Sequence, residues 1–211
     1  MDNSFIQAMR FRHACKKFDE TRSIPADVFE AILESGRLSP SSFGMEPTRL
    51  LVVRDKKKKE QLKALCWNQD QITQASELVI YLSKIADMQS DSNYAMWSFM
   101  RKGINIDRIK AYKDERYKGF LQANGYIDSQ SIFQWSARQA YITASSMMNC
   151  AAYLGVDSCA IEGFEKDNVE KFLALDTFDY QVALIMTFGY RLEAPKRPAP
   201  RISMNEFVQY I

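Results

Sequence analysis

Histidine is almost absent from the sequence, and several motifs that carry chemistry are missing altogether. Among the 211 residues the one histidine is His13. A Ser-His-Asp or Cys-His triad would have to use it, and no G-x-S-x-G turn is present to expose a serine nucleophile. The cysteines and carboxylates show no metal-ligand spacing, so we expect no metal site. An enzyme with this sequence would need a cofactor to carry the difficult chemistry.

The sequence also lacks a charge excess, a leader segment and paired cysteines. Lysine and arginine total 28 against 26 for aspartate and glutamate, a net charge of +2, which is far from the basic footprint of a nucleic-acid-binding protein. Met1 is followed by no basic and apolar regions of a signal peptide, and no apolar run is long enough to cross a membrane. The cysteines are widely spaced, as in a reducing compartment. We therefore expect a cytoplasmic protein without a nucleic-acid or membrane partner.

Length and composition fit a single domain, 1–211, in which 46% of the residues are hydrophobic and can form a core. Hydrophobic periodicity predicts helices at 2–11, 25–38, 56–67 and 167–175 and strands at 50–53, 78–82, 156–161 and 182–190. The strand at 78–82 is apolar throughout and should be central. Charged, aromatic helices at about 86–127 form an excursion, and a proline-rich basic arm at about 193–211 ends in a strand-like alternation at 207–211.

The longest predicted element is a helix from Ser129 to Leu154. It contains neither proline nor glycine, and at ~1.5 Å per residue it forms a rod of roughly 38 Å. Its charges are nearly confined to Asp128 and Arg138, and apolar or small residues occupy every face, which predicts burial on all sides. Gly155 stands where a left-handed residue ends a helix. Small residues near its middle allow another backbone to approach, from the same chain or from a second copy.

Two segments are candidates for ligand binding. Four cations crowd residues 10–17, and they form either a solvated basic surface or an anion site, in which Arg12 forks onto a phosphate and Lys16 supplies a point charge. The loop 39–47 is rich in serine and proline, and it is either a plain connection or a wall that lines a ligand. Cys15 lies between the cations, so its thiol is either an inert buried group or a reactive one with a lowered pKa. We interpret Cys159 as a small buried hydrophobe.

Four segments, taken together and in order, resemble the FMN-dependent nitroreductase family of the oxygen-insensitive NAD(P)H type. They are Arg12-His13-x-x-Lys16-x-Phe18-Asp19, Ser39-Pro40-Ser41-Ser42 with Pro47, Leu154-Gly155-Val156-Asp157-Ser158, and Ile161-Glu162-Gly163-Phe164. The resemblance implies an α+β fold with a mixed central β-sheet flanked by helices. It also implies a homodimer with the long helix at its core, FMN bound tightly but non-covalently at the interface, and a C-terminal arm that adds a strand to the partner's sheet.

The resemblance also implies roles for individual residues. Arg12 and the basic arm would bind the flavin phosphate, and Lys16 would lie near the N1 and C2 carbonyl side of the ring. Asn68 would bind the pyrimidine edge, while Ser41 and Ser42 would come from the second subunit. Lys16 and the backbone of Glu162 and Gly163 would support the chemistry, which the flavin itself carries without a catalytic side chain. The implied cofactor-binding set is Arg12, His13, Ala14, Lys16, Pro40, Ser41, Ser42, Gly44, Asn68, Gln71, Ala160, Ile161, Glu162, Gly163, Arg197 and Arg201.

The sequence departs from the family pattern at several of these positions. Ala14 replaces a usual Ser or Thr, and Gln71 stands where some members have lysine. Ala160 replaces a common proline, and Thr48 a common aromatic residue. In the arm only Arg201 matches the phosphate-binding pair, with Lys196 and Arg197 as alternative partners.

The function that the resemblance implies is a two-electron, ping-pong oxidoreductase. NAD(P)H would give hydride to FMN and leave, and a nitroaromatic, a quinone or a similar acceptor would take the electrons in the same pocket, with residues 97–120 as its roof. No dinucleotide-binding G-x-G-x-x-G is present or required. The alternatives are a flavin reductase or flavin-processing enzyme, and a flavin-binding interaction protein without turnover. The physiological acceptor and the choice between NADPH and NADH stay open.

Overall fold

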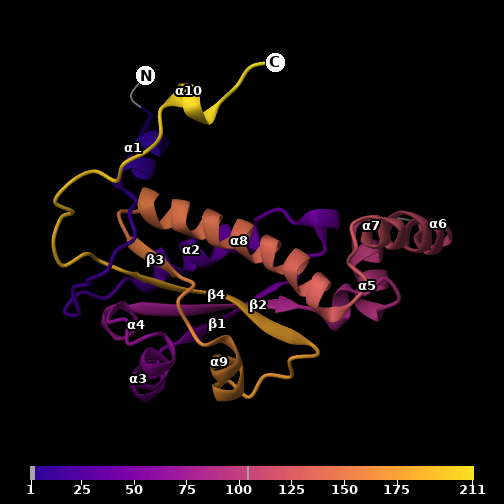
Figure 1. The fold of residues 1–211 in the computed structure, drawn as a ribbon, viewed down its shortest axis with the longest axis horizontal. Coiled ribbons are helices and arrows are strands. Elements are labelled where there is room, and N and C mark those ends of the chain that lie inside the picture. Colours follow the sequence, from indigo (N-terminus) through magenta and orange to yellow (C-terminus); the bar gives the residue numbers. More distant parts are fainter. Residues whose placement is uncertain (1–2, 104) are drawn as a thin grey trace.

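The computed structural model describes residues 3–103 and 105–211, and it is organised around a four-stranded sheet (Figure 1). The strands are β1 (Thr48–Val53), β2 (Glu77–Lys84), β3 (Asp157–Ile161) and β4 (Tyr180–Gly189), in the order β1-β2-β4-β3. The predicted strands and the α+β class are confirmed, and β2 is buried along its whole length. All neighbouring strands are antiparallel, so the described residues do not form the expected mixed sheet by themselves. Their one parallel pairing is an isolated bridge between Ala14 and Ser158.

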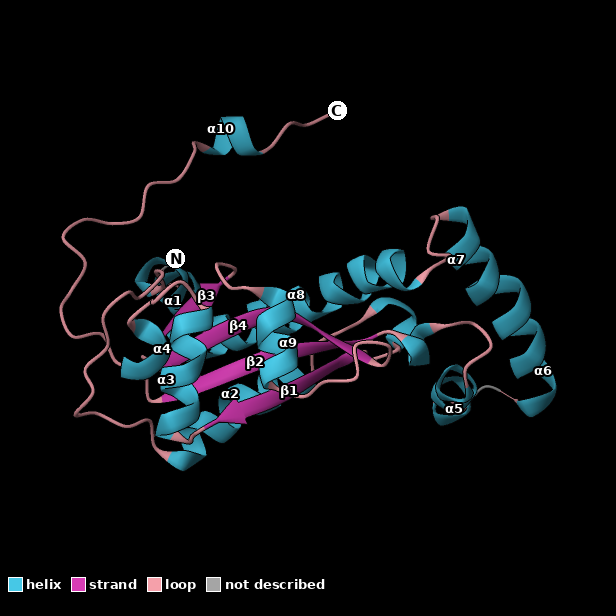
Figure 2. Cartoon of the chain, turned by 60° about the horizontal axis from the view of Figure 1, so that its bottom comes forward, coloured by secondary structure: helices cyan, strands magenta, loops and turns pink. Residues whose placement is uncertain are grey.

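Helices cover both faces of the sheet. The helices α2 (Ala26–Arg37) and α8 (Ser129–Tyr153) lie on one face, and α3 (Lys56–Leu65) and α9 (Lys166–Phe172) lie on the other (Figures 1 and 2). Alternate strand residues separate the two cores, because successive side chains of a strand point to opposite faces. Thus Val79 and Tyr81 join the α8 side, while Leu78 and Ile80 join the α3 side. The helices α1 (Ser4–Phe11) and α4 (Gln71–Gln74) complete this part, and Asp2, the predicted start of the first helix, lies outside the described residues.

The long helix α8 has well-defined ends. Asp128 and Ser131 form a capping box, in which the Asp128 carboxylate accepts a hydrogen bond from the Ser131 N–H at 2.7 Å. At the other end Gly155 has φ +73°, the left-handed conformation that the sequence predicts there. The predicted burial on every side is wrong for the single chain, because several large apolar side chains on α8 and at its C-cap are exposed. Its exposed apolar residues are Tyr141, Ile142, Tyr153 and Leu154.

The predicted excursion is helical and lies beyond one end of α8 (Figure 1). It contains α5 (Asn93–Arg101), α6 (Ile106–Ala111), a π-helical turn (Tyr112–Tyr117) and α7 (Lys118–Ala123); Ile104 lies outside the described residues. Its aromatic core reaches into the loop 39–47, because the Phe43 ring lies 5.3 Å from Tyr117 and 4.9 Å from Phe120. Tyr94 Oη also donates to the Met45 carbonyl at 2.9 Å. The division of the chain into one domain with an excursion and an arm stays a prediction.

The C-terminal segment leaves the body of the chain (Figure 2). The strand predicted at 207–211 is wrong: a short helix, α10 (Met204–Phe207), ends there and the last residues follow as coil. The helix forms because Ser203 and Glu206 make a capping box, in which the side chain of each accepts a hydrogen bond from the backbone N–H of the other. The apolar alternation at 207–211 gives no sign of this capping box. The arm remains open to solvent in the chain, with apolar side chains exposed at Ile202, Met204, Phe207, Tyr210 and Ile211.

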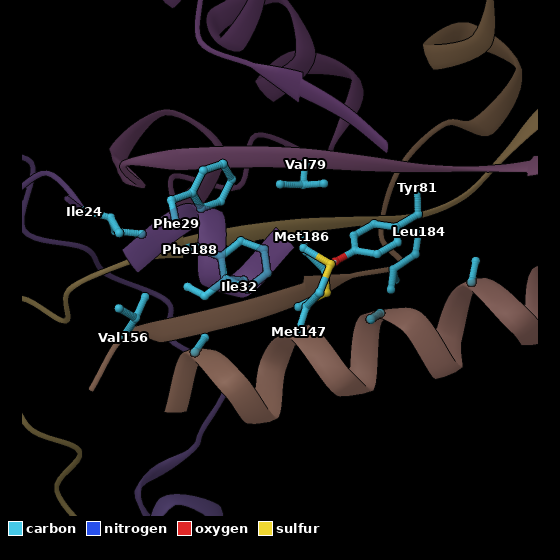
Figure 3. Packing of buried hydrophobic residues seen from close by; sticks show 13 residues of the cluster. Ile24, Phe29, Ile32, Val79, Tyr81, Met147, Val156, Leu184, Met186 and Phe188 are labelled. Atoms are coloured by element: carbon cyan, nitrogen blue, oxygen red, sulfur yellow. The ribbon is translucent and has the colours of Figure 1, made fainter. Parts of the chain in front are cut away.

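Close packing between α2 and α8 depends on the absence of a side chain at Gly36. A Cβ added there would lie 2.7 Å from Met147 Sδ and 3.3 Å from Thr143 Cγ2. Met147 in turn reaches the sheet, where Tyr81 Oη donates to its sulfur at 2.9 Å (Figure 3). The separation of α2 from α8 and the placement of α8 on the sheet are therefore linked through one methionine side chain.

We predict that Gly36→Val destabilises the fold, because the branched side chain forces Met147 away from Tyr81. The free energy of unfolding should fall by about 1–3 kcal/mol, as for other overpacked cores. Chemical denaturation followed by circular dichroism measures it. Gly119→Ala is the matched control: a Cβ at this position of α7 meets nothing within 4 Å, so the change should be neutral or stabilising by up to about 1 kcal/mol. Equal stability of the two variants would contradict the packing argument.

Candidate functional site

The loop that carries Arg12, Ala14 and Lys16 lies along the edge strand β3. Ala14 forms the parallel bridge with Ser158, and the N–H of Cys15 donates to the Ser158 carbonyl at 3.1 Å. These contacts place the loop beside the segment that continues from β3 into Glu162 and Gly163. Two of the four segments that suggested the family therefore lie next to each other in space.

Asp157, at the start of β3, joins this loop to the beginning of the C-terminal arm. Its buried carboxylate accepts from the backbone N–H and Nε of Arg191 at 2.9 and 3.0 Å and pairs with Nη2 at 2.6 Å. Arg191 also donates to the Phe11 carbonyl at 3.2 Å and covers the Phe11 ring. His13 Nδ1 lies 3.6 Å from Asp157 Oδ1, which is too long for a hydrogen bond. His13 thus lies next to this ion pair without a hydrogen bond to Asp157.

The same corner brings three potential metal ligands together. Ligand atoms of His13, Cys15 and Asp157 lie within 4.8 Å of one another. However, Arg191 already contacts both oxygens of Asp157, and the Cys15 thiol donates to the Lys17 carbonyl at 3.2 Å. A cation would have to displace the guanidinium, so we interpret the group as a structural ion pair rather than a metal site.

Burial settles the two interpretations of Cys15 in favour of the inert one. The side chain is buried, and desolvation, helped by the nearby Asp157 carboxylate, raises the pKa of its thiol to about 11. The neighbouring cations do not outweigh this effect. Cys159 is buried in the core on the α3 side, as expected.

A series of polar contacts connects Lys16 with the backbone of Gly163. Its Nζ lies 3.4 Å from Cys159 Sγ, which Gln71 Nε2 also approaches at 4.0 Å. Gln71 donates to Gln69 Oε1 at 2.8 Å, and Gln69 Nε2 donates to the Gly163 carbonyl at 2.9 Å. Gln71 is buried although its type is polar. An exposed lysine thereby gains a defined position relative to the Gly163 backbone.

The turn after β3 offers unused backbone donors. Among the described residues, the N–H groups of Glu162 and Gly163 find no acceptor within the chain, whereas the following N–H of Phe164 bonds back to the Glu162 carbonyl at 3.0 Å. Tyr141 Oη of α8 donates to Glu162 Oε1 at 2.6 Å. Burial and this carboxylate raise the pKa of Tyr141, so it stays protonated as a donor. Ala160 is exposed beside this turn, while Ile161 is buried.

Sequence reasoning missed a tryptophan at this turn. Trp67 and Asn68 follow α3, and both have left-handed backbone, with φ of +55° and +53°. A Cβ added to Gly163 would lie 2.6 Å from Trp67 Cε3, so the indole lies directly against the glycine. Asn68 is exposed beside it. The sequence gives no sign of this contact except the presence of Gly163 and Trp67 themselves, which lie far apart in the chain.

The serine segment does not join this group within one chain. The N–H of Ser42 donates to Gln139 Oε1 of α8 at 2.9 Å, and Ser41 Oγ accepts from the Glu46 N–H at 2.8 Å. Ser41 lines a separate cavity of about 240 Å³ between α2 and β1. Gly44 has φ +54° and faces Lys102 of α5, and Pro40 precedes the segment. A single chain therefore assembles only part of the implied site.

The arm contributes one cation to the Lys16 side. A cavity of about 280 Å³ lies between residues 13–17 and 193–196, and Lys16, Lys17 and Lys196 line it. Arg197 and Arg201 are exposed, and Arg201 Nη1 donates to the Pro200 carbonyl at 2.7 Å. Lys196 and Lys16 thus line the same cavity, whereas the three arginines of the implied set, Arg12, Arg197 and Arg201, do not line it.

Comparisons with known proteins identify the family. The model of the nitroreductase family matches residues 9–190, so the chain belongs to the nitroreductase family. A protein of Staphylococcus epidermidis named "Putative NAD(P)H nitroreductase" is 34% identical, over 100% of this chain and 98% of its own. Among solved structures, a nitroreductase-like protein from Streptococcus mutans has a TM-score of 0.86 at 23% identity and full coverage of both chains. A nitroreductase from Exiguobacterium sibiricum, solved in complex with FMN, has a TM-score of 0.77 at 20% identity, over 100% of this chain and 99% of its own.

Among the described residues, no helix combines the length and the apolar character that a bilayer-spanning helix requires.

We predict that Cys15 and Cys66 resist alkylation in the folded protein. Burial raises their thiol pKa to about 11 and about 12, from 9.0, so at pH 8 the thiolate of Cys15 is about a hundredfold rarer than that of a free thiol. Mass spectrometry after iodoacetamide treatment, with and without urea, measures the protection. Because the unfolded thiols ionise first, stability should fall as the pH rises from about 9 through these values. Rapid native labelling of Cys15 would contradict the burial.

Proposed function

We propose that this protein is an FMN-dependent oxidoreductase that takes hydride from NAD(P)H and reduces nitroaromatics, quinones or similar flat acceptors. Its membership of the nitroreductase family supports an NAD(P)H-dependent enzyme, and the names of its relatives agree. The observation that carries the cofactor assignment is that the Lys16 ammonium lies 3.4 Å from Cys159 on β3, the strand that continues into the two unused N–H donors of Glu162 and Gly163. The similar structure from Exiguobacterium sibiricum, solved with FMN, supports the same ligand.

The residues of this chain fit a flavin mononucleotide. The phosphate is a dianion that needs several cations. Lys17 and Lys196 line one cavity together with Lys16 and Glu193, and Arg12 precedes this loop in the sequence. FMN bound here would accept hydride at its ring and pass two electrons on. Lys16 would hold a fixed positive charge where the reduced ring becomes anionic. The N–H groups of Glu162 and Gly163 would orient the ring, and the exposed Asn68 amide would bind its edge. The implied set of ligands, Gln71 and Arg201 included, remains part of this proposal.

A homodimer would complete the site. Ser41 and Ser42 lie apart from Lys16 in one chain, so a second copy is the natural source of these hydroxyls. The exposed apolar side of α8 and the apolar arm are the surfaces that would meet, because isolated domains rarely expose so many large apolar side chains together. The arm would then pack against the partner, whose edge strand β1 has a side that no strand of the described residues covers. We place this dimer in the cytoplasm, as the composition suggests.

The flavin assignment predicts that the purified protein binds FMN and turns yellow. Under anaerobic conditions NADPH or NADH should bleach the bound flavin, and a quinone should restore the colour. Lys16→Met should lower the two-electron potential of bound FMN by about 30 mV, a tenfold loss of preference for the reduced form, while Lys57→Met on α3 should leave it unchanged. A protein that stays colourless after addition of FMN would refute the proposal, and turnover of free FMN as a substrate would identify a flavin reductase.

The dimer assignment predicts that removal of residues 193–211 reduces both assembly and FMN affinity. Lys196 and the arm's apolar side chains are lost together in this truncation. Analytical ultracentrifugation of full-length and truncated protein at micromolar concentration measures assembly, and flavin fluorescence quenching measures affinity. Phe207→Ser separates the effects, because it removes apolar contact and keeps Lys196. A full-length protein that sediments as a monomer with bound FMN would contradict the shared site.

A further inference from the structure

Trp67 occupies a conformation and a position that folding alone does not explain. Its side chain is 67% exposed, so its large apolar surface gains little from burial. Both it and Asn68 adopt a left-handed backbone, which asparagine tolerates but a bulky side chain such as tryptophan avoids. Such strain tends to persist where function requires a particular geometry. The question is therefore what the exposed indole faces.

The surrounding contacts hold the strained segment firmly. The N–H of Asn68 donates to the Lys63 carbonyl at 3.0 Å, and Gln69 Nε2 bonds to the carbonyls of Cys66 and Gly163 at 3.1 and 2.9 Å. From the other side, the N–H of Glu165 donates to the Leu65 carbonyl at 2.9 Å. The end of α3 and the turn after β3 are thus tied together on both sides of the indole.

Gly163 shows that the contact is close. The hypothetical Cβ would approach two carbons of the indole six-membered ring at 2.6 and 2.8 Å, so only a glycine leaves room for the ring. The unused N–H of Gly163 belongs to the same residue. One side of the indole therefore rests on the backbone that offers its N–H to a ligand, and much of the remaining surface is open to solvent.

We propose that Trp67 is a specificity-determining residue that stacks against planar aromatic acceptors next to the flavin; this inference rests on the proposed function. An indole offers a large, rigid, flat surface that loses little conformational freedom on binding, and aromatic pairs gain from offset or edge contacts beyond the burial of area. The predicted roof at 97–120 is then not the sole determinant of acceptor choice. Acceptors that are small and not planar gain nothing from this wall.

The test compares Trp67→Leu and Trp67→Phe with Phe178→Leu. Phe178 is a matched control, since it is an aromatic side chain with 66% exposure in the connection between α9 and β4. Each protein is loaded with FMN, and binding of 4-nitrobenzoate to the oxidised form is followed by the flavin absorption change, without any turnover. Trp67→Leu should weaken this binding roughly three- to tenfold, the range of aromatic contacts. Trp67→Phe should retain most of it, and Phe178→Leu all of it.

A second measurement separates stacking from damage to the site. Anaerobically reduced protein is mixed with 1,4-naphthoquinone or with ferricyanide in a stopped-flow instrument. For Trp67→Leu the rate constant should fall roughly three- to tenfold with the quinone and stay within about twofold with ferricyanide, which cannot stack. Equal loss with both acceptors, or no loss with either, would overturn the role of Trp67 while leaving FMN chemistry intact. Failure of the unaltered protein to bind FMN would overturn both this inference and the proposed function.

Discussion

The ion pair between Asp157 and Arg191 determines how the peripheral segments meet the sheet. A buried carboxylate is costly unless it is paired and hydrogen-bonded. Here Oδ2 of Asp157 accepts hydrogen bonds from Nε and the backbone N–H of Arg191, and Oδ1 forms an ion pair with Nη2 but accepts no hydrogen bond from the described residues. The pair joins Asp157, the first residue of β3, to Arg191, which lies two residues beyond the end of β4. Arg191 also donates to the carbonyl of Phe11, the residue that ends α1. The loop that carries Lys16 and the start of the arm line one cavity close to this pair in the sequence.

Elements with strong local signals could be predicted from the sequence. The strand β2 is apolar without interruption, and α8 has a capping residue, no glycine or proline, and Gly155 beyond its end. The burial of α8 on every side could not be predicted, because apolar composition cannot tell a core from an interface that a second copy would cover. The strand expected at 207–211 failed for another reason: its alternation was real, yet Ser203 and Glu206 nearby cap a helical turn.

For the candidate site, the sequence suggested individual residues but not the contacts that connect them. Motif order led to Lys16, Glu162 and Gly163, but the chain of contacts from Lys16 through Cys159 and Gln71 to Gly163 depends on side-chain directions that spacing does not reveal. Gln71 illustrates the difference. In the sequence it is only a departure at a position where some members have lysine, whereas in the structure it is a buried amide that contacts Gln69 and Cys159. Left-handed backbone at Trp67 leaves no compositional trace, since neither it nor Asn68 is a glycine.

The aromatic core shared by the excursion and the loop 39–47 has a mechanical consequence. Phe43 is surrounded by Tyr117 and Phe120, and Tyr94 and Ser98 bond to the loop's carbonyls. Helices attached in this way do not behave as a flap on a hinge. Any displacement of α5–α7 large enough to admit a bulky molecule would carry the loop, with Ser41 and Ser42, along with it. In a dimer with a shared site, the opening of that site by α5–α7 and the position of the Ser41 and Ser42 hydroxyls would then change together.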